Sequence, residues 1–249
     1  MFYARTGVAL IQGSSRVFKQ IEEVKDYART NYMNINSRKT KLMLFNSCNS
    51  IAFMPSITLD TDDEIQLVEE MNILGVVLSS DMKWDANTAN MTTKAYSRVW
   101  MLRRLKTLGT EKSDLLDVYI KQVRSILEFA VPVWHPSLNL ADKANLERVQ
   151  KTVLHVILGE NYHDYKHALK ETNLESLEER RTKLCEKFSY KAVKHKKHNN
   201  WFKENTKITK TGQVQPKLCP VISRTIRFQI SPISYLTDLL KTKFNNQKK

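Results

Sequence analysis

The fold of this chain is decided by MNILGVVLSSDMKW (residues 71–84) and by three segments that follow it. These segments are KAYSRVWMLRRLKTLG (94–109), LLDVYIKQVRSILEFAVPVWHPSL (115–138) and LERVQK (146–151). The first is an apolar run rich in β-branched residues, which is typical of strands, whereas the others repeat apolar residues at the spacing of a helix face. The stretch predicts strands followed by at least three amphipathic helices, with basic residues outside the core.

Four amphipathic helices are expected between residues 85 and 194, because the apolar period changes from two to about 3.6 residues after Asp81. Their expected buried stripes are Met91, Ala95, Val99, Leu102 and Leu105; Leu115, Val118, Tyr119, Val123, Ile126, Leu127 and Ala130; Leu146, Val149, Val153, Val156 and Ile157; and Leu174, Leu177, Leu184 and Phe188. The expected end signals are Gly109, Pro132 and Gly159, and the expected caps are Ser113, Asn139 with Asp142, and Thr172 with Glu175. Short connections predict a bundle of antiparallel neighbours.

The first 84 residues are expected to form a smaller β/α unit. Residues 8–12 are apolar and partly β-branched, which predicts a strand ended by Gly13, and Ser14 or Ser15 then caps a helix. The expected apolar stripe of this helix is Val17, Phe18, Ile21, Val24 and Ala28. Further strands are expected at residues 41–46, around Ile57 and Leu59, at 65–68 and at 73–78.

The remaining residues, 195–249, are expected to be a flexible basic linker with one short helix, because they lack the apolar spacing of a core. In SPISYLTDLL (231–240), Ser231 can act as a cap and Pro232 occupies the first helical position. Ile233, Leu236 and Leu240 then share one face. The chain is therefore predicted to be α+β, with boundaries at 1–84, 85–194 and 195–249.

Composition favours an anionic partner inside the cell. Forty Lys and Arg against 26 Asp and Glu give a formal charge of +14, which suits nucleic acid or merely a soluble basic surface. Cys48, Cys185 and Cys219 are far apart, which indicates a reduced, intracellular protein, in the nucleus or the cytoplasm. No apolar run approaches the roughly 20 residues of a membrane span, and the amino terminus does not read as a signal peptide.

Several of these segments also resemble a known family in their order and spacing. They are LGVVLSSDMKW (74–84), KAYSRVWMLRRLK (94–106), VRSILEFAVPVWHPSL (123–138) and LERVQKTVLHVILG (146–159), with NINSRKTKLMLF (34–45) upstream and LESLEERRTKLCEKF (174–188) and SPISYLTDLL (231–240) downstream. Together they resemble the carboxyl-terminal part of reverse transcriptases from non-LTR retrotransposons of the jockey-like and chicken-repeat type. The resemblance implies the end of a palm with primer-grip-like strands in residues 1–84, and a thumb-like bundle in residues 85–194.

The same resemblance implies that catalysis is lost. Such polymerases hold two metal ions on carboxylates, which activate the primer hydroxyl. The paired Asp positions of the family's Tyr-Ala-Asp-Asp-like word fall here on Arg5 and Thr6, or on Thr6 and Gly7. The family's other metal-binding Asp and its fingers are expected upstream of Met1. We therefore expect no enzyme activity, no catalytic residue and no cofactor.

Other constellations of reactive residues are weak. The acidic group Asp60, Asp62, Asp63 and Glu64 reads better as a solvated turn than as a metal site. The pairs His163 with His167 and His195 with His198 lack a further ligand for zinc. No metal site is therefore predicted.

The residues alone favour an ordinary solvated helix face, and the resemblance to polymerase thumb helices makes nucleic-acid binding an equal expectation. The candidate contacts are Lys39 and Lys41, which match the family's Asn-x-x-Lys-Thr-Lys word, and Lys94, Arg98, Arg103, Arg104 and Lys106 on the first bundle helix. Trp100 lies among them and could stack on a base or pack in the core of an ordinary solvated helix. We expect weak, nonspecific binding of RNA or DNA and no membrane partner; the alternative is a structural or protein-interaction module whose protein partner the sequence does not name.

Overall fold

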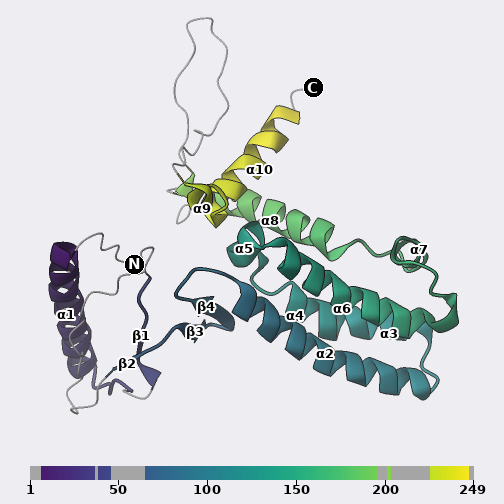
Figure 1. The fold of residues 1–249 in the computed structure, drawn as a ribbon, viewed down its shortest axis with the longest axis horizontal. Coiled ribbons are helices and arrows are strands. Elements are labelled where there is room, and N and C mark those ends of the chain that lie inside the picture. The colour runs from purple at the N-terminus through teal and green to yellow at the C-terminus, as the bar shows by residue number, and fades with distance from the viewer. Residues whose placement is uncertain (1–6, 37–38, 46–64, 196–200, 203–224, 247–249) are drawn as a thin grey trace, which may run out of the picture. The chain divides into compact units, whose positions relative to one another are not determined.

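The computed structural model describes residues 7–36, 39–45, 65–195, 201–202 and 225–246, and it divides the chain into two compact units, Met1–Ala86 and Asn87–Lys249 (Figure 1). The described part combines small two-stranded sheets near the amino terminus with many helices, which confirms the α+β class. No described helix is long and apolar enough to cross a membrane. The predicted strand around Ile57 and Leu59 and the acidic group at residues 60–64 lie outside the described residues.

The amino-terminal unit begins with a long helix, α1 (Gly7–Thr30), where a strand at residues 8–12 was expected. That prediction is wrong: Ala9, Leu10 and Gln12 are good helix formers, and their preference outweighs the short β-branched signal and Gly13. Within α1, Val24 is 57% exposed, so the predicted stripe is only partly correct.

After α1 in the chain, strands β1 (Lys41–Leu42) and β2 (Gln66–Leu67) pair in parallel, with Lys41 opposite Gln66. Both are shorter than the predicted runs at residues 41–46 and 65–68. Ile65, the residue just before β2, is buried against partly buried Ile21, Ile35 and Leu42. This small apolar cluster joins α1 to the parallel pair.

Strands β3 (Glu70–Ile73) and β4 (Val76–Ser79) form an antiparallel hairpin, whereas one strand at residues 73–78 was expected. Leu74 (φ 51°) and Gly75 (φ 89°) make the two-residue turn, which requires positive φ at both positions. The side-chain oxygen of Asn72 accepts a hydrogen bond from the Gly75 N–H at 2.9 Å. The turn thus breaks the apolar run into two paired strands.

The carboxyl-terminal unit is helical. Its elements are α2 (Asp85–Thr107, whose first two residues belong to the other unit), α3 (Lys112–Val118), the π-helix η2 (Tyr119–Arg124), α4 (Ser125–Leu127), α5 (Val131–Trp134), η3 (His135–Ser137), α6 (Leu140–Leu158), η4 (Gly159–Asn161), α7 (Tyr165–Glu171), α8 (Leu177–Lys194), α9 (Ile226–Gln229) and α10 (Pro232–Asn246). Helix α6 packs on α3 and α8, and α8 packs also on α5 and α10 (Figure 1).

The core of this unit follows the predicted stripes of α2 and α6 closely. In α2, Met91, Ala95, Val99 and Leu102 are buried and Leu105 is half-buried. In α6, four of the five predicted residues are buried and Val156 is half-buried. Asn139 caps α6 by accepting a hydrogen bond from the Asp142 N–H at 2.7 Å, which confirms that cap.

The second predicted helix is divided into α3, η2 and α4. Its buried residues are Leu115, Tyr119, Val123 and Leu127, and Val131 continues the series in α5. Ser113 lies inside α3 rather than at its cap, which is Glu111, and the helix stops before Ala130, not at Pro132. Pro132 instead stands in the first turn of α5, where its missing N–H costs little.

Helix α8 begins later than the Thr172 and Glu175 signal predicted. Ser176 is its cap, and with Glu179 it forms a capping box, whereas Thr172 ends α7. The buried face consists of Leu177, Arg181, Cys185, Ser189 and Ala192, while Leu184 is half-buried and Phe188 is 37% exposed. The predicted stripe is therefore correct at Leu177, and it is wrong by one position at Leu184 and Phe188, next to buried Cys185 and Ser189.

Helix α10 lies against α8 and α5. Leu236 and Leu240 are 2% and 3% exposed, and Ile233, on the same predicted face, is 41% exposed. The Ser137 hydroxyl donates to the Ile230 carbonyl at 2.8 Å, which ties η3 to the segment before α10. Leu236 and Leu240 thus add to the core of the helical unit.

Candidate nucleic-acid interface

Helix α2 presents its basic residues to solvent because its apolar residues occupy the opposite side. Lys94, Arg98, Arg103 and Arg104 are all exposed, and their contacts with phosphates stay a prediction. Residues three or four apart share a face of an α-helix. The face opposite the Ala95 and Val99 stripe is therefore open along much of α2.

Trp100 lies on the open side of α2 and is 63% exposed. The expectation that Trp100 could pack in the core is therefore wrong. The Arg104 guanidinium carbon lies 5.9 Å from the centroid of the indole ring, in the range of a cation–π contact. An exposed ring beside a cation is suited to stacking on a base while the cation meets a phosphate.

The exposed cations of α2 form two groups. Arg103 and Arg104 follow Trp100 by three and four residues and so share its face. Lys94 and Arg98 are four residues apart and form a second row on the neighbouring flank. The helix therefore offers one surface with a ring and two arginines, and a second with two cations.

Lys106 does not belong to this surface. Its ammonium donates to the Ile157 carbonyl at 2.7 Å, in the last turn of α6. Helix C-termini carry unsatisfied carbonyls and a partial negative charge, so a lysine there stabilises the helix end. Lys106 thus holds α2 to α6, and its contact with nucleic acid stays a prediction.

Lys39 and Lys41 lie in the amino-terminal unit. Asn36 holds the turn that carries Lys39, because its side-chain oxygen accepts a hydrogen bond from the Lys39 N–H at 3.0 Å. Lys39 is exposed, whereas the Lys41 ammonium donates to the side-chain oxygen of Gln66 across the β1–β2 pair. Lys41 has a local partner, so Lys39 is the more available cation of the two.

An open cleft of about 590 Å³ in the helical unit was not found by sequence reasoning. It is lined by Arg124, Lys166, Leu169, Lys170, Asn173, Leu174, Glu175, Glu179 and Arg180. The signal in the sequence was the pair Lys166 and Lys170, four residues apart on α7. The arginines could not be assigned to this site, because they come from η2 and α8 and meet only in the folded chain.

Comparison with protein-family models, curated proteins and solved structures gives no match. The resemblance to non-LTR reverse transcriptases therefore rests on the quoted segments alone.

Metal ligands do not gather in the part of the chain that the structure describes, where no three His, Cys, Asp or Glu side chains could hold an ion. The rings of His163 and His167 lie 5.1 Å apart, and His167 Nδ1 lies 3.8 Å from Glu171, whose other oxygen accepts from Lys112. Position 198 of the second histidine pair lies outside the described residues. The described histidine pair is thus engaged in local contacts.

A buried polar network joins η2, α6 and α7. The Tyr119 hydroxyl donates to Gln150, whose amide donates to the Tyr165 hydroxyl at 3.1 Å and to the Glu175 carbonyl at 2.9 Å. Tyr165 in turn donates to Glu147, which also accepts from the Leu177 N–H at 3.0 Å. Burial raises the pKa of both tyrosines far above the usual range, so both hydroxyls stay protonated and serve as donors.

Proposed function

We propose that this chain is a catalytically incomplete remnant of a non-LTR retrotransposon RNA-directed DNA polymerase, whose thumb-like helix α2 binds RNA or DNA weakly and without sequence preference. The observation that carries the proposal is the exposed Trp100 beside Arg104, with further exposed cations along the helix. The resemblance of the quoted segments supports the ancestry. Nucleic acid would be met inside the cell.

The chemistry of the α2 surface is suited to backbone recognition. Phosphate contacts provide affinity without reading sequence, and an aromatic ring stacks on any base. The formal charge of +14 would attract a polyanion from a distance. Weak binding follows because α2 offers only a few cations on each face.

Loss of polymerase activity is part of the same proposal. Arg5, Thr6 and Gly7 stand where the resembled family has its paired aspartates, and neither arginine, threonine nor glycine supplies a carboxylate for metal. We expect no template-dependent incorporation by the purified chain with magnesium or manganese. Measured incorporation would refute this part of the proposal.

The binding proposal is tested by fluorescence anisotropy of the full chain with labelled single-stranded and duplex oligonucleotides across a salt series. We expect log affinity to fall as log salt rises, with a slope reduced by about one for each phosphate contact removed. The Trp100→Ala/Arg104→Gln variant should bind about tenfold more weakly, because one stacked base is worth roughly 1–3 kcal/mol.

Two control variants separate the surface from bulk charge. Lys106→Met removes a cation of the same helix that is already bonded to Ile157, so it should lower stability by about 1 kcal/mol and leave the salt slope unchanged. Lys187→Gln/Lys191→Gln removes two exposed cations from α8. If the parent shows no salt-sensitive binding at low ionic strength, the structural or protein-interaction alternative replaces this function.

A further inference from the structure

The open cleft of about 590 Å³ between η2, α7 and the start of α8 has an arrangement of charges that points to an anionic ligand. Its volume falls within the range of roughly 300–1,000 Å³ that is usual for small-molecule sites. Arg124 comes from the π-helix η2, and such wide turns occur frequently at functional sites. The cleft lies on other elements than the α2 surface, so the inference does not rest on the proposed function.

The two arginines of the cleft share one carboxylate. Arg180 donates to both oxygens of Glu128, with Nη2 to Oε2 at 3.0 Å, and Arg124 Nε lies 3.5 Å from Glu128 Oε1. The three side chains are only 13–28% exposed. Two guanidiniums against one carboxylate leave one net positive charge among the side chains that line the cleft, and guanidinium groups suit the oxygens of a phosphate.

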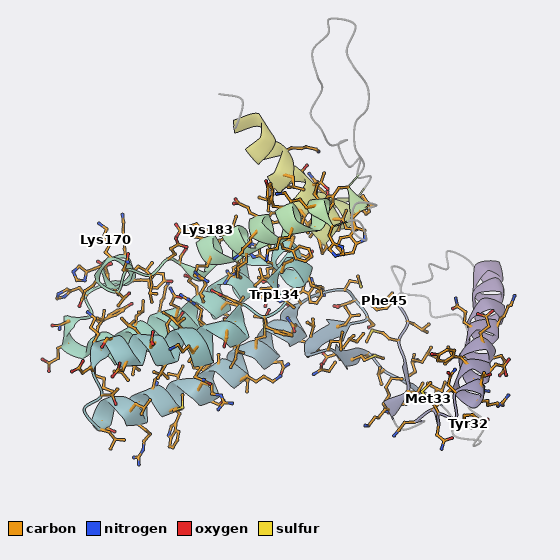
Figure 2. The ribbon with its side chains drawn as sticks, turned by 180° about the vertical axis from the view of Figure 1, so that it is seen from behind. Tyr32, Met33, Phe45, Trp134, Lys170 and Lys183 are labelled. Carbon is orange, nitrogen blue, oxygen red and sulfur yellow. The ribbon has the colours of Figure 1, made fainter. Side chains whose placement is uncertain are left out.

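The ammonium groups of the two lysines of the cleft have no hydrogen-bond acceptor within the described part of the chain. Lys166 and Lys170 are both exposed on one face of α7, and Figure 2 shows Lys170 at the edge of the helical unit. Both acidic groups of the lining are engaged elsewhere: Glu175 accepts from Lys183, and Glu179 accepts from the Ser176 N–H in the capping box. The lysines therefore have no direct ion-pair partner, and the lining as a whole carries four basic side chains against two acidic ones.

We propose that this cleft binds a phosphate ester. The phosphate would lie among Lys166, Lys170 and the guanidiniums of Arg124 and Arg180, which match phosphate geometry as paired and point-charge donors. Leu169 and Leu174, which also line the cleft, would contact the apolar face of the esterified group. A free nucleotide and a nucleotide within a single strand both supply this chemistry.

Isothermal titration calorimetry of the full chain at low ionic strength tests the site with inorganic pyrophosphate, adenosine triphosphate and a ten-residue oligothymidylate. We expect saturable binding of adenosine triphosphate, tighter than that of pyrophosphate because of the apolar contacts. The Lys166→Gln/Lys170→Gln variant should weaken it about tenfold or more, since two charge-assisted contacts are lost. If the oligonucleotide binds this cleft more tightly than the nucleotide, the ligand is the strand.

Lys187→Gln/Lys191→Gln is the matched control, because it removes the same charge at the same spacing from exposed positions of α8 outside the cleft lining. It should bind as the parent does, and so should Trp100→Ala/Arg104→Gln with adenosine triphosphate. Absence of saturable binding by all three probes overturns the proposal. An equal loss of affinity in the control variant, or parental affinity in the cleft variant, also overturns it. The proposed function of α2 is tested separately, by the Trp100→Ala/Arg104→Gln variant.

Discussion

Arg181 is a buried cation in the core of the helical unit, and a single neighbouring side chain accepts a hydrogen bond from it. The residue is 0% exposed, its Nε donates to His135 Nδ1 at 3.4 Å, and its two terminal nitrogens have no partner among the described residues. Burial lowers the pKa of Arg181, and the negative charges of Glu147 and Glu178 oppose that shift. Because Nδ1 of His135 must accept, the imidazole has to be neutral.

This requirement predicts that acid destabilises the protein through His135. Burial, and then the charges of Arg181 and Lys143, lower the pKa of His135 from 6.5 to about 4, against the opposing charge of Glu178. The unfolded chain therefore binds the proton more readily, so this contribution is fully present above about pH 6.5 and is lost as the pH falls toward 4. Its size is at most about 3 kcal/mol.

The measurement is the free energy of unfolding in urea at pH 7.5, 6.0 and 5.0, for the parent and for His135→Asn. The asparagine oxygen can still accept from Arg181 but does not titrate. The parent should lose stability relative to the variant as the pH falls. Curves that stay parallel across this range would mean that His135 can be protonated without cost.

At the scale of elements, the segment α3–η2–α4 keeps one side buried by changing its pitch. Leu115, Tyr119, Val123 and Leu127 are spaced by four residues, whereas a regular α-helix has 3.6 residues per turn and would rotate such a series off the core. The π-helix η2 turns more slowly and restores the alignment. Helix α4 then ends at Leu127, and Ala130, the N-cap of α5, takes a left-handed conformation with φ 51° and ψ 28°.

The left-handed Ala130 predicts a stabilising substitution. An L-residue with a Cβ costs roughly 1–2 kcal/mol in this conformation, which glycine adopts freely. After allowance for the larger entropy of glycine in the unfolded chain, Ala130→Gly should raise the free energy of unfolding by about 0.5–1 kcal/mol. Urea denaturation measures the change.

The same exchange in a regular helix should have the opposite sign. Ala144 is exposed inside α6, where glycine is less favourable than alanine by about 1 kcal/mol. Ala144→Gly is therefore the matched control. If Ala130→Gly is as destabilising as the control, the strain inferred for Ala130 is absent.

Sequence reasoning worked best where one long helix buries one regular stripe. The α2 stripe from Met91 to Leu102 and the Asn139 cap of α6 were predictable, because period and capping are local properties. It was least successful where tertiary context decides. The Leu74–Gly75 turn depends on the pairing of β3 with β4. The π-helix η2 depends on packing against residues far away in the sequence, and the acceptor of Lys106 is 51 residues away.

The candidate surface was predictable to a similar extent. The exposure of the basic residues of α2 was predictable from its apolar stripe, since they occupy the helix positions outside that stripe. Whether Trp100 faces the core or solvent depended on one helical position, which the sequence left open. The cleft around Arg180 could not be predicted from the sequence, because Glu128 and Arg180 are 52 residues apart.

For the whole molecule, the last described segment completes the helical unit. Helix α10 covers α8 and α5 with Leu236 and Leu240, and the Tyr235 ring meets His135 edge-on at 5.9 Å. These two leucines therefore belong to the core, although they follow a long polar stretch in the sequence. Removal of α10 would expose the face of α8 that α10 contacts.

We predict that a fragment of residues 85–194 is helical but less stable than one of residues 85–249. Full burial of two leucines is worth about 3–6 kcal/mol as an upper estimate, so the shorter fragment should melt at a clearly lower temperature. Thermal unfolding followed by circular dichroism gives the comparison, and 8-anilinonaphthalene sulfonate should bind the shorter fragment more strongly. Equal melting temperatures would show that α10 does not contribute to the core.

The uneven burial of the four tryptophans gives the protein a built-in optical signal. Trp134 and Trp84 are 0% and 7% exposed, whereas Trp100 and Trp201 are 63% and 41% exposed. Indoles in water emit at longer wavelength and are reached by soluble quenchers such as iodide, so the red edge of the emission belongs to the exposed pair. A ligand that covers α2 should quench or shift the red edge of the tryptophan emission. A ligand that enters the cleft should leave the emission spectrum unchanged, because the lining of the cleft holds no tryptophan.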